Sequence, residues 1–338
     1  MADEPPLRIS VALLGLGNVG KSFLRYVARL DEGRRIRVQI GAVADSSGGM
    51  VLESPEQLEL LLAHKESGGS IRQFSPLQAL DPGPFIANLP HVGISALLES
   101  LPTNLIDGEP ALSTLTATLA QGTNVVTVDK GPLVHGFETL ARTAASSGAR
   151  LAFTGTTGVP QPEGLSGDRV LEIRGVLNGT TNYILTEMQE RSLPFDLALS
   201  RAQADGIAEP NPAQDTEGWD TACKILILAK ALMGADTRLA EVSRVGISRE
   251  TEKLIQEARA TGQVVRLIGR ARIWKGRVRV SVAPKLISQD SPLFHVAGTS
   301  KAAIFRTESG GEVLSRGYSG RDAIARTMLD DLKKVTAI

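Results

Sequence analysis

A glycine-rich turn between an apolar segment and an amphipathic segment constrains the fold of this chain more than any other feature. Residues 9–14 are apolar and stop at Gly15, as a buried parallel strand does. After the turn, residues 19–30 place apolar side chains on one helical face. The order of strand, glycine turn and helix predicts a nucleotide-binding α/β unit built on a parallel sheet.

The spacing of the glycines favours a dinucleotide. Glycines in a G-x-G-x-x-G turn allow a tight bend and let a pyrophosphate approach the helix N-terminus. The six residues of this turn are Gly15, Leu16, Gly17, Asn18, Val19 and Gly20. A second strand, residues 38–44, leads to Asp45, whose carboxylate can accept the ribose 2′-hydroxyl. We therefore expect NAD or NADP, with Asp45 favouring NAD; Arg34, Arg35 and Arg37 oppose that preference by their charge.

A rival motif overlaps the same turn. Gly15-x4-Gly20-Lys21-Ser22 fits the phosphate loop of NTPases, and residues 125–128 with Asp129 resemble the strand and acid that hold magnesium there. The extra Gly17 and the acid Asp45 favour the dinucleotide. A P-loop NTPase remains the alternative.

A charged stretch at residues 202–224 is the candidate for chemistry. Its charged members are Glu209, Asp215, Asp220 and Lys224. Glycines and prolines predict a loop that enters a helix near Asp215 or Gly218, where Asp220 and Lys224 share a face. Held against a core, such a pair suits acid–base catalysis. An ordinary helix start with a surface ion pair explains the same residues, and the residues of this stretch alone favour that interpretation.

The whole stretch has a recognisable pattern. From Ala202 to Lys224 it reads A-x3-G-I-A-x2-N-P-x2-D-x2-G-x-D-x3-K, which resembles the signature of homoserine dehydrogenases; Thr216 departs from it, since an aliphatic residue is usual there. The resemblance implies that Glu209 and Asp215 hold the substrate ammonium. It also implies that Asp220 and Lys224 lie at the reacting hydroxyl, and that Gly206 contacts the cofactor.

Three further stretches resemble the same family. The first is residues 101–133, in which Pro102 and Thr103 are expected to contact the cofactor. Lys130 in the same stretch is expected to contact both the substrate and the nicotinamide. Its neighbour Asp129 stands where the family has Asn. Residues 178–182 match N-G-T-x-N, so Gly179 and Thr180 are expected to seat the substrate, although capping of a helix by Thr180 explains the motif as well. Gly317 and Gly320 resemble the glycine loop over the nicotinamide.

The implied architecture has two domains. Residues 1–155 form a Rossmann-type, doubly wound parallel sheet, to which a C-terminal helix in 316–338 returns. Residues 156–315 form an α+β domain that binds substrate and dimerises. In it, Lys275-Gly276 predicts a hairpin turn, and five arginines on one face (Arg266, Arg270, Arg272, Arg277 and Arg279) predict a solvated sheet surface. For residues 46–90 we expect a helix and loops without chemistry.

Composition limits the partners. Lys+Arg and Asp+Glu both number 37 in 338 residues, which favours neither nucleic acid nor an anionic membrane. A single cysteine, Cys223, indicates a reducing, cytoplasmic environment. The four histidines lie far apart, so no metal ligands are assigned. The family's monovalent cation lies near a carboxylate, and Ala152 stands at that position here, so the resemblance does not carry the cation site over.

The expected activity is NAD(P)-dependent interconversion of L-homoserine and L-aspartate 4-semialdehyde, in threonine and methionine biosynthesis. The protein is expected to be a compact homodimer that lacks a C-terminal regulatory domain and is not inhibited by threonine. A catalytically silent NAD(P)-binding regulator is a second alternative. Aspartate-semialdehyde dehydrogenase is disfavoured because its nucleophilic cysteine must be exposed, and Cys223 lies within a predicted helix.

Overall fold

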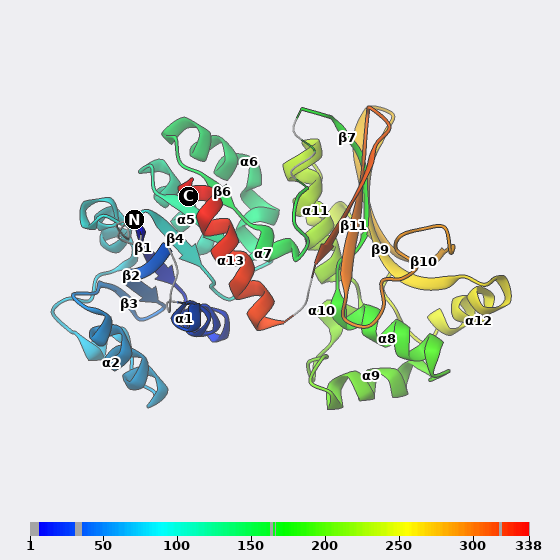
Figure 1. The fold of residues 1–338 in the computed structure, drawn as a ribbon, viewed down its shortest axis with the longest axis horizontal. Helices are drawn as coiled ribbons and strands as arrows, with labels where there is room; N and C mark the ends of the chain where they lie inside the picture. The colour runs from blue at the N-terminus through cyan, green and yellow to red at the C-terminus, as the bar shows by residue number, and fades with distance from the viewer. Residues whose placement is uncertain (1–6, 31–35, 163–164, 166, 318–319, 338) are drawn as a thin grey trace, which may run out of the picture. The chain divides into compact units, whose positions relative to one another are not determined.

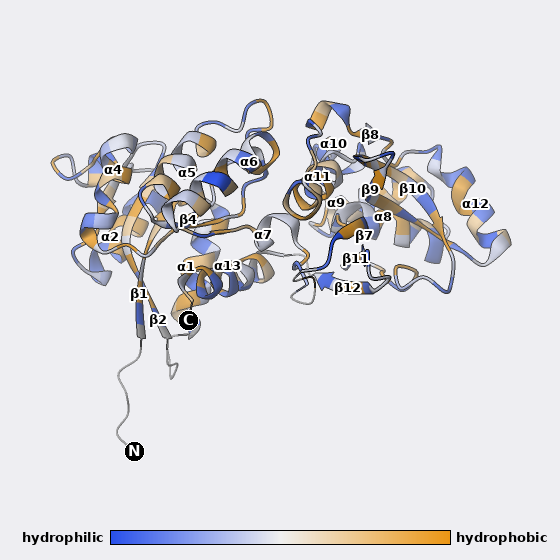
Figure 2. Cartoon of the chain, turned by 90° about the horizontal axis from the view of Figure 1, so that it is seen from above, coloured by the Kyte–Doolittle hydropathy of each residue, from blue (hydrophilic) through white to orange (hydrophobic). Residues whose placement is uncertain are grey.

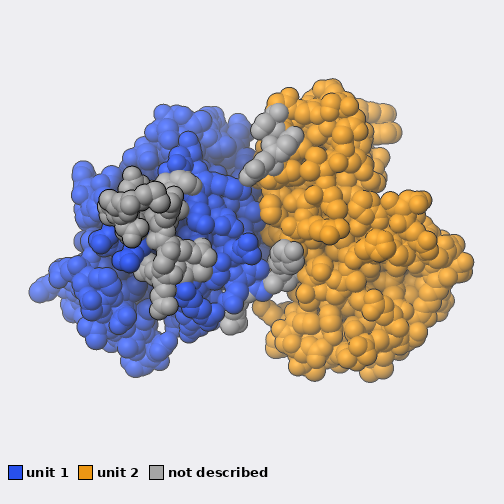
Figure 3. Space-filling view, viewed as in Figure 1, with its two compact units in different colours: residues 1–156, 320–338 blue, residues 157–319 orange. Residues whose placement is uncertain are grey.

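A computed structural model describes residues 7–30, 36–162, 165, 167–317 and 320–337. The chain divides into two units, Met1–Thr156 with Gly320–Ile338, and Thr157–Ser319 (Figures 1 and 3). The described residues include no helix long and apolar enough to cross a membrane.

The first unit contains the predicted parallel sheet. Its strand order is β3-β2-β1-β4-β5-β6, in which β3 alone is antiparallel to its neighbour. The strands are β1 (Leu7–Leu14), β2 (Ile36–Asp45), β3 (Gly48–Val51), β4 (Ala96–Glu99), β5 (Asn124–Thr127) and β6 (Leu151–Ala152). The helices α1 (Asn18–Leu30), α5 (Ala111–Ala120) and α6 (Lys130–Ser147) follow β1, β4 and β5. This is the expected Rossmann-type arrangement.

The C-terminal helix α13 (Arg321–Thr336) completes the core of this unit. Met328 and Leu332 of α13 are fully buried, in one cluster with Val11 and Leu13 of β1 and Phe23 of α1. Figure 1 shows α13 alongside α1. The last residues of the chain therefore pack against the first strand and the first helix.

Residues 46–90 contain more structure than expected. Besides β3, they form α2 (Pro55–Glu66), α3 (Ile71–Phe74), α4 (Pro82–Asn88) and the short helix η1 (Pro90–Val92). The edge strand β3 folds back on β2 through a turn at residues 46–47, and its first residue, Gly48, has a φ of 140°, which suits glycine.

Helix α6 is kinked at Gly136, where φ is −127° and ψ is 21°. Its first segment begins at Lys130, because the Asp129 side chain accepts the N–H of Gly131 (2.9 Å) and caps the helix there. The strand β6 is only two residues long and is followed by the one-turn helix α7 (Thr154–Thr157).

The second unit is the expected α+β domain, with a sheet in the order β12-β11-β7-β9-β10-β8. The strands are β7 (Val170–Val176), β8 (Ser243–Arg244), β9 (Val264–Trp274), β10 (Arg277–Ile287), β11 (Lys301–Thr307) and β12 (Glu312–Gly317). The helices are α8 (Gly179–Glu190), α9 (Phe195–Ala204), α10 (Ala213–Thr216), α11 (Trp219–Met233), η3 (Leu239–Glu241) and α12 (Thr251–Thr261). Hydrophobic residues gather along the strands of both units (Figure 2).

Helix α11 lies close against this sheet. A Cβ atom on Gly269 of β9 would lie 3.1 Å from side-chain atoms of both Thr221 and Ile225. The apolar run after Lys224 is fully buried, as in Ile225 to Ala229, at 0% exposure. The backbone that carries Asp220 and Lys224 is therefore fixed by packing.

The hairpin turn of the second unit is as predicted, but one arginine of the predicted solvated face is buried. Lys275 and Gly276 both have positive φ (49° and 77°), as a two-residue hairpin turn requires. Arg266 is only 4% exposed and donates to the Phe294 carbonyl (3.0 Å), while Arg270 pairs with the buried Glu172 of β7. The expectation of a solvated face was wrong for Arg266, whose guanidinium lies against the loop at Phe294. Arg270 pairs with Glu172, and 43% of its side chain stays exposed.

Candidate active site

The glycine turn of the first unit has room for a phosphate group. Gly15 has a φ of 99°, and a Cβ on Gly20 would lie 2.1 Å from the Gly15 carbonyl oxygen, so both positions require glycine. A Cβ on Gly17 would meet no atom within 4 Å. Helix α1 begins at Asn18, and the first N–H groups of a helix have no partner within it. The turn thus fits a pyrophosphate.

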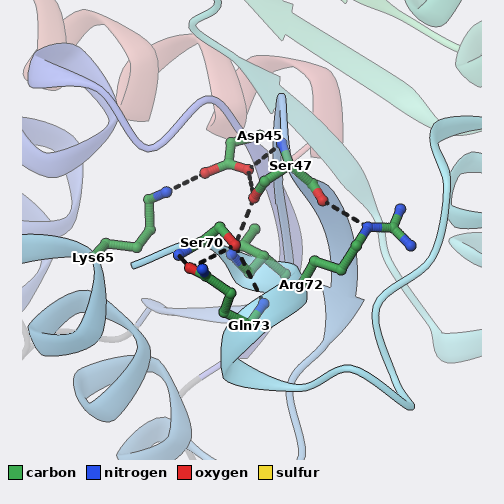
Figure 4. A network of polar contacts seen from close by, with 7 residues as sticks. Asp45, Ser47, Lys65, Ser70, Arg72 and Gln73 are labelled. Carbon is green, nitrogen blue, oxygen red and sulfur yellow. Dashed lines mark hydrogen bonds and ion pairs between the residues drawn. The ribbon is translucent and has the colours of Figure 1, made fainter. Parts of the chain in front are cut away.

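At the end of β2, Asp45 is not a free carboxylate (Figure 4). Its Oδ1 accepts the N–H and the hydroxyl of Ser47 (2.8 and 2.6 Å), and its Oδ2 pairs with the Lys65 ammonium from α2. Burial opposes ionisation of Asp45, but Lys65 and Ser47 outweigh it and hold the pKa of this carboxyl below its usual value. The sequence analysis assigned no role to Lys65, since nothing in residues 46–90 indicated that α2 reaches Asp45.

The ends of β4 and β5 hold two buried acids. Glu99 is fully buried, accepts the N–H of Leu101 (2.6 Å) and hydrogen-bonds the Thr127 hydroxyl (2.5 Å). Burial, and then the charge of Asp129, raise the pKa of Glu99 to about 8. Burial also raises the pKa of Asp129, against hydrogen bonds that include one from Thr103. Glu99 comes shortly before Pro102 and Thr103 in the chain, and Asp129 directly precedes Lys130.

In the second unit, Asn178 connects the predicted site residues. It is the N-cap of α8: its Oδ1 accepts the N–H of Thr181 (2.8 Å). Its Nδ2 donates to Asp215 (2.6 Å) and to Asp220 (2.8 Å). Capping by Thr180 was the wrong interpretation, because the Thr180 hydroxyl donates to the Ile207 carbonyl (3.1 Å) instead. The N-G-T-x-N motif contained Asn178, but the sequence analysis gave it no role in the site.

Asp220 and Lys224 form a buried ion pair, 2.6 Å from Oδ2 to Nζ. The Lys224 side chain is 11% exposed and that of Asp220 12%. Lys224 also donates to the Leu177 carbonyl (3.1 Å) at the end of β7. The alternative of an ordinary surface pair was therefore wrong.

Asp215 makes this cluster acidic overall. Burial, followed by the charge of Asp220, raises the pKa of Asp215, while Asn178, Lys224 and Thr180 oppose the rise. The carboxylates of Asp215 and Asp220 thus interact with the same lysine, Lys224, and the same amide, Asn178, in a largely buried site. Such a site attracts a second cation, for example a substrate ammonium.

The remaining predicted positions are spread over both units. Glu209 is exposed, and its carbonyl accepts from Gln203 (3.2 Å). Gly206 has a φ of 69° after α9. A Cβ on Gly317 would lie 1.8 Å from the Gly158 carbonyl oxygen, so only glycine fits at the end of β12. Gly320 is the N-cap of α13 in the first unit, and Gly179 is the buried first residue of α8.

No group of three His, Cys, Asp or Glu side chains suitable for a metal ion occurs in the described ranges. Ala152 in β6 brings no ligand, and the buried Asp331 carboxylate accepts the N–H of Thr154 (2.8 Å) at the start of α7.

Comparison with known proteins identifies the family of this chain. Residues 160–332 match the family model described as "Homoserine dehydrogenase". The chain is 34% identical over 334 residues to a homoserine dehydrogenase of Methanocaldococcus jannaschii, with 96% of this chain and 97% of the relative covered.

The chain belongs to the homoserine dehydrogenase family.

Two other homoserine dehydrogenases extend the comparison. The NAD(+)-dependent enzyme of Pseudomonas canavaninivorans is 33% identical, over 95% of this chain and 94% of its own length. A solved hyperthermophilic archaeal homoserine dehydrogenase mutant in complex with NADPH has a TM-score of 0.77 at 26% identity, and covers 98% of both chains. Membership in the homoserine dehydrogenase family confirms the expected NAD(P)-dependent oxidoreductase activity, and the P-loop NTPase alternative was wrong.

Proposed function

We propose that the chain interconverts L-homoserine and L-aspartate 4-semialdehyde at the cluster of Asn178, Asp215, Asp220 and Lys224. The observation that carries the proposal is the burial of a lysine against two carboxylates that one amide connects. A surface helix needs no such arrangement, because burying charges is costly unless they are paired.

The two charged groups of the amino acid fit groups of opposite charge in the site. Asp215 holds the substrate ammonium, with Glu209 from the neighbouring loop as a second acid. The substrate carboxylate lies at the N-terminus of α8, where the amides of Gly179 and Thr180 belong to the first turn. This arrangement selects an α-amino acid and orients its side-chain hydroxyl.

Lys224 takes the hydroxyl proton during oxidation. In its neutral form the amine has two N–H groups and one lone pair. Asp220 and the Leu177 carbonyl accept two N–H groups from Nζ, which leaves the lone pair for the substrate hydroxyl. Asp220 thereby orients the amine and stabilises the ammonium that forms.

The nicotinamide of NAD or NADP, when bound, exchanges the hydride with the substrate carbon. Lys130, beside Asp129, acts as the positive anchor at the substrate. The residues proposed to hold the cofactor are Gly15, Leu16, Gly17, Asn18, Val19, Gly20, Asp45, Pro102, Thr103, Lys130, Gly206, Gly317 and Gly320.

The test is a spectrophotometric assay of homoserine oxidation with NAD and NADP in parallel. Turnover with either cofactor supports the proposal. Cofactor binding without turnover of homoserine or the semialdehyde supports the silent regulator instead. We also propose a cytoplasmic homodimer: the dimer rests on family membership, and the compartment rests on the single, buried cysteine, Cys223. Light scattering coupled to size-exclusion chromatography would contradict the dimer by giving the mass of a single 35.8 kDa chain.

A further inference from the structure

Two buried acids lie next to Lys130, and the steps proposed for catalysis do not involve them. Glu99, the last residue of β4, has no exposed surface, and Asp129, directly before Lys130, is 2% exposed. A carboxylate is costly to bury, so a buried acid either stays neutral or is paired with a cation. The family has asparagine at the position of Asp129, so the second acid is a departure of this chain.

The Thr127 hydroxyl joins the two acids. It donates to Oε2 of Glu99 (2.5 Å) and accepts the N–H of Asp129 (3.0 Å). Each carboxyl has a further contact, since Oε1 of Glu99 accepts the N–H of Leu101 (2.6 Å) and Oδ1 of Asp129 accepts the N–H of Gly131 (2.9 Å). These bonds hold both carboxyls at the carboxyl ends of the parallel strands β4 and β5, the edge at which ligands of such sheets bind.

The charges that act on the two acids come from the acids themselves and from Lys130. Asp129 acts on Glu99, and Lys130, at the start of α6, acts on Asp129. A single lysine charge balances one carboxylate of such a pair but not both. The other elements around the pair contribute Leu14 of β1, in register with Glu99, Thr156 of α7, whose hydroxyl donates to the Thr127 carbonyl (2.9 Å), and Asp331 of α13, which accepts the Thr154 N–H (2.8 Å).

We propose that Glu99 and Asp129 share one proton at neutral pH and act as positioning residues that set the charge beside Lys130. With one proton, the pair carries a single negative charge, which Lys130 balances. Loss of that proton adds a second negative charge in a buried site, draws the lysine ammonium toward the acids and lowers its positive potential at the substrate oxygen. The effect on the substrate rests on the place proposed for Lys130 in catalysis, whereas the shared proton does not.

The order of the two ionisations follows from the surroundings of each acid. Two interacting carboxyls in a buried site lose their protons in two separate steps. Burial, and then the charge of Asp129, raise the pKa of Glu99 to about 8, so Glu99 is the acid that keeps the proton at pH 7. Asp129→Asn removes the second cause and leaves the first. The ionisation of Glu99 should therefore move to lower pH in this variant but stay above its usual value of 4.5.

Infrared difference spectra of the full chain test the shared proton without catalysis. Subtracting the spectrum of Glu99→Gln from that of the wild type should leave the C=O band of a protonated carboxylic acid at pH 7, and the band should disappear with a midpoint at about pH 8. In Asp129→Asn the band should titrate about one pH unit lower or more, the scale of the effect of a neighbouring charge. If Glu99→Gln does not fold, pH-difference spectra of the wild type and Asp129→Asn carry the test.

The pH profile of kcat/KM for homoserine tests the role beside Lys130. The ratio of wild-type to Glu99→Gln kcat/KM should be constant up to about pH 7 and fall about threefold or more by about pH 9, because only the wild type gains the second charge. Glu138→Gln removes an exposed acid of α6 and is the matched control, for which the same ratio should stay constant. A residue that only supports the fold would change kcat/KM equally at all pH values.

Two kinds of result overturn the inference. Absence of the infrared band, or an equal midpoint in the wild type and Asp129→Asn, would mean that the acids share no proton. A titrating band with a constant ratio of kcat/KM up to pH 9 would mean that the pair does not act on Lys130. If the wild type does not turn over homoserine at all, the proposed function is wrong and the role beside Lys130 fails with it, while the infrared titration still decides the shared proton.

Discussion

The carboxylate of Asp220 and the ammonium of Lys224 are 2.6 Å apart, one helical turn from each other on α11, with both side chains almost nine-tenths buried. An isolated pair of this kind contributes little to stability, because desolvation offsets the attraction. Its burial beside Asn178 and Asp215 therefore indicates a functional arrangement, and the predictions below separate that role from structural support.

Lys224→Ala should lower kcat by about a hundredfold or more, the usual scale for loss of a positioned base, while cofactor binding is retained. Stopped-flow and steady-state assays with cofactor titration would measure both. Lys230→Ala, in the last turn of the same helix, is the control and should retain activity. Near-normal kcat with an unchanged pH profile in Lys224→Ala would mean that the lysine is structural.

Asn178→Ser should separate helix capping from the amide bridge. Serine caps helices about as well as asparagine, so the melting temperature should change little. Loss of the Nδ2 donor leaves Asp215 and Asp220 facing each other without the hydrogen bonds of 2.6 and 2.8 Å. We expect kcat/KM for homoserine to fall about tenfold or more, on the scale of a lost charge-assisted hydrogen bond. Asn178→Asp should be worse still, since it adds a third carboxylate; wild-type kinetics in that variant would contradict the bridge.

Gly17→Ala should weaken NAD(H) binding by about tenfold or more without lowering the melting temperature. The added Cβ meets no protein atom within 4 Å, so only a ligand that approaches the turn closely can be displaced. Fluorescence titration with NADH measures the effect. Gly83→Ala, which also meets no atom, is the control, whereas Gly20→Ala should destabilise the fold because its Cβ would lie 2.1 Å from the Gly15 oxygen. Unchanged NADH binding in Gly17→Ala would remove the turn from the site.

Glu99→Gln should make the folded state less sensitive to alkaline pH. The pKa of Glu99 is raised to about 8, so the folded state binds a proton that the unfolded state releases near its usual value of 4.5. The stability gained from protonated Glu99 is complete below pH 4.5 and is lost as pH rises toward 8, by about 1.4 kcal/mol per pH unit at most. Glutamine can keep both hydrogen bonds, to Leu101 and Thr127, without ionising.

Melting temperatures of the wild type and Glu99→Gln at pH 5 and pH 9 check this. The two proteins should melt alike at pH 5, and the variant should melt higher at pH 9. Glu138→Gln, at an exposed position on α6, should match the wild type at both pH values. A parallel fall of wild type and Glu99→Gln with pH would mean that other groups set the alkaline limit.

Local pattern was enough to predict the elements whose signals lie within a few residues. Gly15 and Gly20 predicted the glycine turn, and Lys275 and Gly276 predicted the hairpin. The four-residue spacing of Asp220 and Lys224 predicted that their side chains pair. The contacts of Lys65 with Asp45 and of Asn178 with Asp215 were not predictable in this way. Each joins segments that only the tertiary fold brings together, and a lysine or an asparagine carries no periodic signal of its partner.

The start of α8 shows a second limit. The N-G-T-x-N motif was compatible with capping by Thr180, but Asn178, the residue before the helix, accepts an N–H of the first turn and sets the start. Asp129 does the same at the start of α6. Side-chain capping competes with apolar periodicity, and it decides boundaries that periodicity leaves open.

The return of α13 to the first unit affects the order in which the protein can mature. Chains generally fold domain by domain from the N-terminus as they are synthesised. Here the side chains that close the first core, Met328 and Leu332, follow the second unit in the chain. The second unit, residues 157–319, is therefore synthesised in full before the first unit can bury its own strands.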